Sequence, residues 1–214
     1  RTTAFKTVRI DELALQKHGI TLETYDLSAV FARMAALKGS DAALKAKAKT
    51  LKGYACWAKA SARAFDQIAR LGVVLDRMVE EAGLDCLAVR CWVEMQQQLG
   101  ISPCVLLSEM NERGIPTACE VDVCNAVMMR ALMLASGKPA ACLDWNNNYE
   151  DDEDKCILFH CGPVPSSLMA APGKIVENPI LATSLGAGCS YGCNVGRLAP
   201  GGFTYASLIT DAGR

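Results

Sequence analysis

Residues 114–144, GIPTACEVDVCNAVMMRALMLASGKPAACLD, carry the pattern that decides the fold class. A short apolar stretch at 115–120 predicts a buried strand, and the apolar residues at 123–135 predict a helix that ends at Gly137. Residues 140–144 then repeat the strand pattern. Strands that alternate with helices indicate an α/β fold, with a parallel or mixed sheet flanked by helices.

The alternation continues on both sides of this stretch. Residues 86–92 predict a preceding strand, 105–113 a helix, and 156–160 a further strand. Upstream, residues 40–83 are expected to be helical almost throughout, and 20–25 alternate apolar and polar side chains as a half-buried strand does. We therefore expect a largely helical N-terminal part that leads into the strand and helix units of one sheet.

The composition changes after Cys161. Residues 163–214 are rich in Gly and Pro and lack a helical period, with only short strand-like pieces such as 204–209. We predict an α/β domain at 1–162, followed at 163–214 by the start of an all-β, barrel-like domain. We also expect the chain to be a segment of a longer protein.

Charge and hydropathy exclude several classes of function. There are 22 Lys and Arg against 23 Asp and Glu, and no basic stripe with interleaved aromatic residues, so we expect no nucleic-acid partner. No apolar run approaches the roughly 20 residues that span a bilayer, and residues 1–5 begin no signal peptide. A cytoplasmic protein without membrane contact is the expectation.

Eleven cysteines are many for 214 residues. Most lie among Ala, Val, Leu and Met, where a reduced thiol acts as a small apolar group. No CxxC pair occurs, and the nearest approach to a zinc pattern is the spacing of Cys189 and Cys193. We expect reduced packing thiols that form no disulfide. A thiol-based metal or redox protein is the alternative.

Three polar side chains stand at the carboxyl ends of consecutive predicted strands, namely Glu120, Asp144 and His160. Open α/β sheets bind ligands at the carboxyl ends of their strands. Two carboxylates and an imidazole suit a divalent metal with oxygen and nitrogen ligands. Each of the three also fits an ordinary capping or turn position, so spacing alone leaves both interpretations open.

The segment GIPTACEVDVCNA at 114–126, followed by an apolar helix and SGKP at 136–139, resembles the signature of L-fucose isomerase-like proteins. In that family a glutamate, a polar residue and an aspartate precede a helix that ends in a TGKP-like turn, and the next strand ends in an aspartate. Residues 88–94, AVRCWVE, and the beginning of the chain at 1–5 look like further family segments.

The resemblance implies a site and a cofactor. It carries over to Glu120 and Asp144 as the catalytic pair and as metal ligands. His160, in HCG at 160–162, takes the place of a metal-binding histidine of L-arabinose isomerases, or else hydrogen-bonds a sugar hydroxyl. The implied metal is Mn²⁺, with Mg²⁺ or Co²⁺ as alternatives, and the implied assembly is a homo-oligomer, either a hexamer or a trimer.

The implied reaction interconverts an aldose and a ketose, a pentose or a 6-deoxyhexose such as L-fucose or D-arabinose, through an ene-diol. A metal that binds O1 and O2 of the sugar stabilises the developing oxyanion, and two carboxylates can serve as base and acid. The alternative is a non-catalytic sugar-binding or scaffold protein of the same fold.

Further side chains are candidates for substrate contacts. Glu94 either faces the sugar or satisfies backbone N–H groups at a helix start. Trp145 either forms an apolar wall for the sugar or is buried in the core. Asn146 belongs to an Asn run that either lines the site or forms a plain turn. Asp122 is expected to cap the helix that begins at 123 rather than to bind metal.

Overall fold

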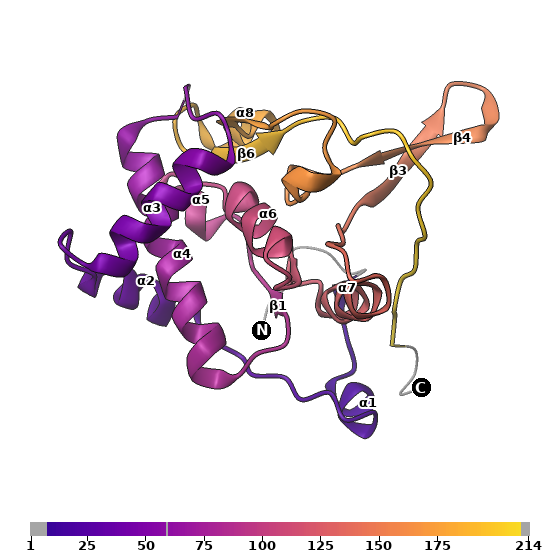
Figure 1. Ribbon diagram of the computed structural model, residues 1–214, viewed down its shortest axis with the longest axis horizontal. Coiled ribbons are helices and arrows are strands. Elements are labelled where there is room, and N and C mark those ends of the chain that lie inside the picture. The colour runs from indigo at the N-terminus through magenta and orange to yellow at the C-terminus, as the bar shows by residue number, and fades with distance from the viewer. Residues whose placement is uncertain (1–7, 59, 211–214) are drawn as a thin grey trace.

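The computed structural model describes residues 8–58 and 60–210 (Figure 1); the family-like segment at 1–5 lies outside the described residues. The N-terminal part is helical, as predicted, with α1 (Glu12–Lys17), α2 (Leu27–Ala36), α3 (Ala42–Tyr54) and α4 (Ala62–Ala82). Each of these helices begins after a side chain that accepts a hydrogen bond from a first-turn N–H, namely Asp11, Asp26, Asp41 and Ser61. Such N-caps explain where the helices start.

The later elements are shorter and mix strands with helices. They are β1 (Leu87–Ala88), α5 (Glu94–Leu99), α6 (Cys104–Glu112), β2 (Thr117–Ala118), α7 (Val123–Ser136), β3 (Asp144–Tyr149), β4 (Asp152–Phe159), η2 (Ser166–Leu168), β5 (Lys174–Glu177), α8 (Pro179–Leu185) and β6 (Tyr191–Val195). Strands β1 and β2 pair in parallel, whereas β3 pairs with β4 and β5 with β6 in antiparallel fashion. The predicted α/β class is confirmed.

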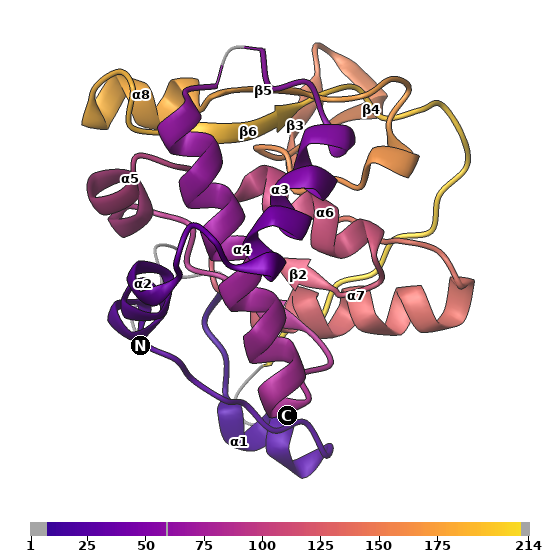
Figure 2. The same cartoon turned by 60° about the vertical axis from the view of Figure 1, so that its left-hand side comes forward.

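Helix α4 organises the main core. Its buried apolar residues recur at helical spacing and include Ile68, Leu71, Val74 and Met78, which face α2, α3 and β6. Figure 2 shows α4 running through the molecule beside α3. Burying one such side chain stabilises the fold by about 1.5–3 kcal/mol. Within the described ranges no helix is both long and apolar enough to cross a membrane.

The pairing of the strands differs from the expected sheet. Residues 140–143 lie outside strands, and β3 begins at Asp144 instead of ending there. Strands β3 and β4 form an antiparallel hairpin that projects from the rest of the molecule (Figure 1). The turn at 150–151 that connects them is too short for a parallel crossover. Short apolar runs do not reveal which partner a strand will take, because their pattern is the same in both arrangements.

Two predicted strands are wrong. Residues 20–25 form an irregular connection between α1 and α2, and 204–209 are irregular as well. A strand needs a hydrogen-bonded neighbour, and within the described part of the chain neither segment has one that forms a ladder. Side chains 20–23 are alternately half-buried and exposed along this irregular connection, and this explains the apolar–polar alternation without a strand.

The segment after Cys161 packs directly on the first part of the chain. Strand β6 contacts α4 and α6, and Ser102 donates its backbone N–H to the carbonyl of Tyr191 at 2.7 Å. Cys56 likewise donates to Gly173 at 3.0 Å, and Ile175 belongs to the main core. The proposed boundary at 162 stays a prediction, while the described part of 163–210 shares a core with the helices before it.

Large apolar side chains remain exposed on the hairpin and on the final described segment. They include Trp145, Phe159, Phe203, Tyr205 and Ile209. The rings of Trp145 and Tyr205 lie 5.6 Å apart, so the two segments contact one another. Exposed apolar surface of this kind is typical of interaction sites. Assembly into a hexamer or trimer stays a prediction.

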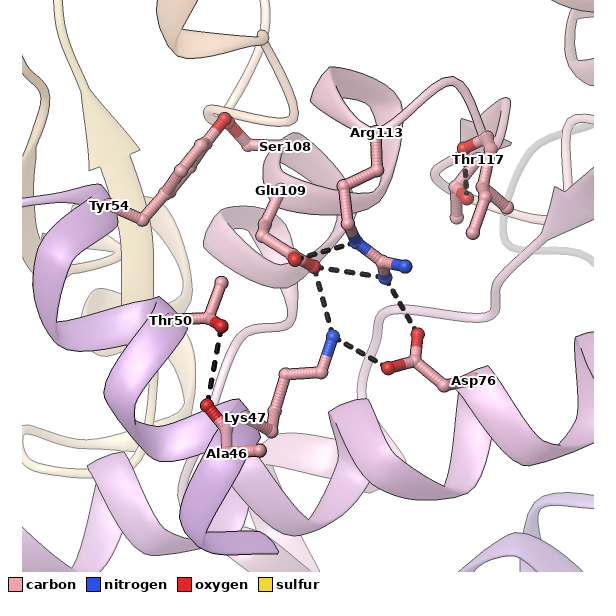
Figure 3. Close-up of polar contacts among 10 residues, drawn as sticks. Ala46, Lys47, Thr50, Tyr54, Asp76, Ser108, Glu109, Arg113 and Thr117 are labelled. Atoms are coloured by element: carbon pink, nitrogen blue, oxygen red, sulfur yellow. Dashed lines mark hydrogen bonds and ion pairs between the residues drawn. The ribbon is translucent and has the colours of Figure 1, made fainter. Parts of the chain in front are cut away.

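A buried ion-pair network joins α3, α4 and α6 (Figure 3). Lys47 Nζ lies 2.7 Å from Asp76 Oδ2 and 3.2 Å from Glu109 Oε2, and Arg113 pairs with both acids. Only 7% of the Lys47 side chain and 2% of Glu109 are exposed. Buried charges are tolerated when they are paired in this way. The network therefore specifies how the three helices lie against each other.

Candidate active site

A cavity of about 200 Å³ lies where the segments after β1 and β2 meet the hairpin and the start of α8. Its volume suits a small molecule better than a drug-sized ligand, for which pockets measure roughly 300–1,000 Å³. Glu120, Asp144 and His160, the three side chains that the sequence places at strand ends, all line it. The structure thus brings the predicted site residues to one cavity.

Glu120 stands two residues after β2, in the turn that follows the strand, near the carboxyl end where the sequence predicts it. Its φ is 64° and that of Val121 is 61°, a left-handed conformation that is uncommon for side chains other than glycine and unusual for a β-branched one. The turn is held by the N–H of Val121, which donates to the Val89 carbonyl at 3.2 Å. Strain of this kind costs about 1–3 kcal/mol per residue and concentrates at functional sites.

Asp144 and His160 meet because of the hairpin register. Asp144 pairs with Phe159, so the first residue of β3 lies opposite the last residue of β4, and His160 follows immediately. The sequence placed both side chains at the carboxyl ends of neighbouring strands, which is wrong for Asp144. Asp144 is exposed and forms the rim of the cavity, whereas His160 is half-buried.

Burial and neighbouring charges shift the pKa values of Glu120 and His160. Burial, with the nearby carboxylate of Asp144, raises the pKa of Glu120 to about 7, although His160 opposes the shift. Burial also disfavours the charged form of His160. The hydrogen bond with Cys161 and the carboxylates of Asp144 and Glu120 outweigh it, so the pKa of His160 lies above its ordinary value. A carboxyl with a pKa near 7 can accept or donate a proton at neutral pH.

This shift predicts a pH-dependent stability for the metal-free chain. In the unfolded state a glutamate ionises near pH 4.3, about two to three pH units below Glu120 in the folded state. Between these values the folded state binds more protons, so this contribution to the free energy of unfolding falls as pH rises from about 4.5 to about 7. Urea unfolding of the wild type and Glu120→Gln across this range, with a chelator present, measures it. A difference between the two proteins that stays constant with pH would contradict the prediction.

The predicted substrate-contacting residues lie outside the cavity lining. Glu94 is the first residue of α5 and pairs with Arg90 at 2.8 Å, an arrangement that agrees with a helix-entry position. Trp145 is 61% exposed, so the alternative of burial in the core is wrong. Asn146 lies in β3, so the alternative of a plain turn is wrong as well. Their roles toward a sugar stay predictions.

Asp122 caps α7, as expected. Its side chain accepts from the backbone N–H of Asn125 at 3.0 Å, and the side-chain amide of Asn125 donates to the second oxygen at 2.6 Å. Both carboxylate oxygens are thus occupied by the helix start. Glu120 therefore lines the cavity, whereas Asp122, on the other side of the strained turn, has a structural role.

The cavity also contains a buried amide that the sequence analysis missed. Gln96 is 1% exposed, and its Nε2 donates to the carbonyls of Cys91 and Ile101 at 2.9 Å each. Its Oε1 has no hydrogen-bond partner among the described residues. In the sequence Gln96 is one of three successive glutamines, and no signal distinguishes it from the exposed Gln97 and Gln98.

The expected metal can be tested against these donors. The chemical types of Glu120, Asp144 and His160 suit the metal, because two carboxylates and an imidazole are ligands that Mn²⁺ accepts. In geometry the set is incomplete, since among the residues that the structure describes no three His, Cys, Asp or Glu side chains are gathered closely enough to hold an ion. Glu120, Asp144 and His160 share a cavity without converging on one point.

All eleven cysteines fall within the described residues and are free thiols. We predict that titration in denaturant, without reductant, returns all eleven, because most of them occupy apolar positions and none is cross-linked. Ellman's reagent on freshly purified protein measures this, with a reduced aliquot as the reference. A shortfall of two or more thiols in the unreduced aliquot would contradict the prediction.

Comparison with known proteins relates the chain to sugar isomerases. No family model matches it. It is 29% identical over 102 residues to the sulfoquinovose isomerase of Priestia aryabhattai, which is 48% of this chain and 23% of that enzyme. For the enzymes of the same name from Alkalicoccus urumqiensis and Clostridium sp. (strain MSTE9), the identities are 31% over 90 residues and 26% over 164 residues.

These matches have a limited extent. They cover 42% and 76% of this chain in the latter two cases, but 20% and 36% of the relatives, so the chain spans well under half the length of the curated proteins it matches. Their shared name points to sugar isomerisation and does not single out the L-fucose isomerase-like proteins that the motif at 114–126 resembles.

Proposed function

We propose that the chain is the substrate- and metal-binding part of an aldose–ketose isomerase that acts through an ene-diol. The observation that carries the proposal is that Glu120, Asp144 and His160 all line one small cavity. The similarity to enzymes named sulfoquinovose isomerase supports the same reaction class. That the whole protein catalyses this reaction is part of the same proposal.

The reaction requires a proton to move between C1 and C2 of an open-chain sugar. Glu120 suits this task because its pKa of about 7 balances proton affinity against proton release at neutral pH. Asp144, at the rim, is the second carboxylate and takes part in transfer to and from the sugar oxygens. His160, whose pKa is raised, can donate a hydrogen bond to the oxygen that gains negative charge when it holds no metal; as a metal ligand it would instead act through an unprotonated ring nitrogen.

Mn²⁺ is the metal we propose, held by Glu120, Asp144 and His160. When bound it supplies Lewis-acid stabilisation of negative charge on the sugar oxygens. Since the three side chains do not converge on one point, binding requires them to move together or another ligand to complete the site. Isothermal titration of the chelator-treated chain with MnCl₂ measures this step separately from turnover.

We propose an uncharged pentose or 6-deoxyhexose as substrate. The described lining of the cavity includes no Lys or Arg, so a sulfonate group would find only His160 as a cationic partner there. Sulfonates and phosphates are typically recognised by arginine, lysine or helix N-termini, and at the start of α8 the N–H groups of Ile180 and Leu181 already donate to Asn178 Oδ1. Sulfoquinovose, the substrate named for the relatives, is therefore the competing candidate that the assay has to include.

The test is an assay of the chain with Mn²⁺ in D₂O against L-fucose, D-arabinose, quinovose and sulfoquinovose. We expect ketose formation and deuterium at C2 of recovered aldose, seen by NMR, because an ene-diol exchanges that proton with the solvent. Both signals should disappear with a chelator and return with Mn²⁺. Turnover of sulfoquinovose alone would overturn the substrate proposal and leave the reaction class intact.

A sugar-binding protein without turnover is the second candidate. The separation of the three ligand side chains favours it, because a site that does not gather its metal has no strong Lewis acid. Saturable sugar binding in calorimetry, with no deuterium exchange at any Mn²⁺ concentration, would establish this candidate. Absence of both binding and exchange would overturn both.

A further inference from the structure

Five thiols from separate segments converge beside the candidate site. They are Cys91 after β1, Cys104 at the start of α6, Cys119 after β2, Cys161 after β4 and Cys193 in β6. The sulfur atoms of Cys104 and Cys161 are in contact, and the thiols of Cys91, Cys119 and Cys193 lie near enough to influence the pKa values of Cys104 and Cys119. We call these five residues the thiol cluster. No function assigned to the cavity so far uses it.

Within the thiol cluster, Cys104 and Cys161 form a distinct pair. Their Sγ atoms are 3.4 Å apart, and both residues line the cavity. Of the other members, Cys91 also lines the cavity and Cys119 does not, while Cys193 donates its thiol to the backbone carbonyl of Cys161 at 2.9 Å. Cys104 and Cys161 are the two whose sulfur atoms approach each other at the cavity wall. A small reagent that enters the cavity therefore meets two adjacent sulfur atoms.

The pair also touches the candidate site directly. Cys161 Sγ lies 3.3 Å from Nδ1 of His160, whose ring lines the same cavity. The backbone N–H of Cys161 donates to the same Nδ1 at 2.8 Å. A change in the position or chemistry of this sulfur therefore changes the surroundings of the His160 imidazole.

We propose that Cys104 and Cys161 are a redox-sensitive pair that peroxide converts to a disulfide within the cavity. One thiol reacts with hydrogen peroxide to give a sulfenic acid and one water molecule. The second thiol attacks that sulfur, the S–OH bond breaks, and a second water molecule leaves as the S–S bond forms. Two thiols lose two electrons in total, and peroxide is reduced to water.

Disulfide formation requires only a small movement of the side chains. The sulfur atoms must approach from 3.4 Å to the roughly 2.05 Å of an S–S bond. The movement takes the Cys161 sulfur toward α6 and replaces its S–H, so the contact with His160 is altered. The consequence for turnover rests on the proposed function, whereas formation of the cross-link does not.

The first experiment treats the purified chain with equimolar hydrogen peroxide and maps its disulfides by mass spectrometry. We expect a loss of about 2 Da from the intact protein and one cross-linked peptide pair that joins Cys104 and Cys161, both reversed by dithiothreitol. Cys104→Ser and Cys161→Ser should each prevent it. Cys56→Ser, at an exposed thiol outside the cluster, is the matched control and should leave it unchanged.

Two results would overturn the proposal that Cys104 and Cys161 form a redox-sensitive pair. One is an unchanged mass after treatment, and the other is a cross-link between other cysteines in the wild type. Because Cys104 is buried, Cys104→Ser is checked for folding by circular dichroism, and Cys161→Ser provides the second variant if it is unfolded. A sulfinic acid on Cys161 without any cross-link would also contradict the proposal.

The second experiment measures isomerase turnover before and after the same treatment. A reversible loss of at least about tenfold in the wild type, absent in Cys104→Ser when its treated and untreated turnover are compared, is the expected result. A cross-linked protein that keeps full turnover would overturn the link between the pair and the site. If the chain shows no isomerase activity at all, the proposed function fails. The disulfide map still decides whether peroxide cross-links Cys104 to Cys161.

Discussion

Glu120→Gln is expected to lower kcat of the proposed isomerase reaction by about 10²–10⁴-fold with a smaller effect on KM, because the amide keeps the shape of the side chain but cannot exchange a proton with carbon. Asp144→Asn should have a loss of similar size, since the second carboxylate is then missing from the cavity rim. Steady-state kinetics on the best substrate of the panel, with saturating Mn²⁺, provides the measurement.

Glu153→Gln is the matched control for this prediction. It makes the same chemical change at a carboxylate exposed on β4, outside the cavity, and should leave kcat within about twofold. Deuterium exchange at C2 gives a second readout, which should fall with kcat for Glu120→Gln. If Glu120→Gln retains the turnover of the wild type, Glu120 is not the proton-transfer group and the site assignment fails.

Lys47→Met is expected to lower the free energy of unfolding by about 3 kcal/mol. Removing one member of a buried ion pair costs roughly 3–5 kcal/mol because the opposite charge stays buried without its partner. The lower end applies here, since Arg113 still pairs with Asp76 and Glu109. Methionine keeps most of the length of the lysine stem, so the change reports the charge more than the packing. Urea denaturation followed by circular dichroism measures it.

Arg33→Met is the matched control, because Arg33 pairs with Glu81 at 2.7 Å on the surface, where both side chains are about half exposed. Such a pair contributes at most about 1 kcal/mol. The double variant Lys47→Met with Glu109→Gln should lose less than the sum of the single changes, since the two residues share one network. Equal losses for Lys47→Met and Arg33→Met would show that the buried network is not what stabilises the contact of the three helices.

The sequence predicted one part of the candidate site, the position of Glu120, because that position depends on residues close to it in the chain. Glu120 follows a short apolar strand and precedes a helix capped by Asp122, and this strand–helix unit lies within about 20 residues of chain. Its features are decided by neighbours in the sequence, so the pattern predicts them. The strained φ of Glu120 and Val121 had no such signal, because surrounding structure has to impose it.

Asp144 and His160 line one cavity through a strand arrangement that the sequence did not predict. The sequence placed them at the carboxyl ends of consecutive strands of a parallel or mixed sheet, whereas the antiparallel register of β3 and β4 brings the start of one strand to the end of the other. Gln96 and the thiol cluster were not predicted as neighbours of the site at all. Their members come from segments up to about 100 residues apart, and nothing in the local pattern of any one segment indicates the others.

By itself the sequence determined most of the helices, the capping of α7 by Asp122, the α/β class and the carboxylate that follows β2, whereas α5 and α8 were not predicted. Helical periodicity and capping depend on residues three or four positions apart, so the chain encodes them locally. The tertiary structure alone decided the strand partners, the docking of β6 on α6, the pairing of Lys47 with Glu109 and the 3.4 Å approach of Cys104 to Cys161. These contacts join distant parts of the chain, and their free energy comes from burial that exists only after the whole core has formed.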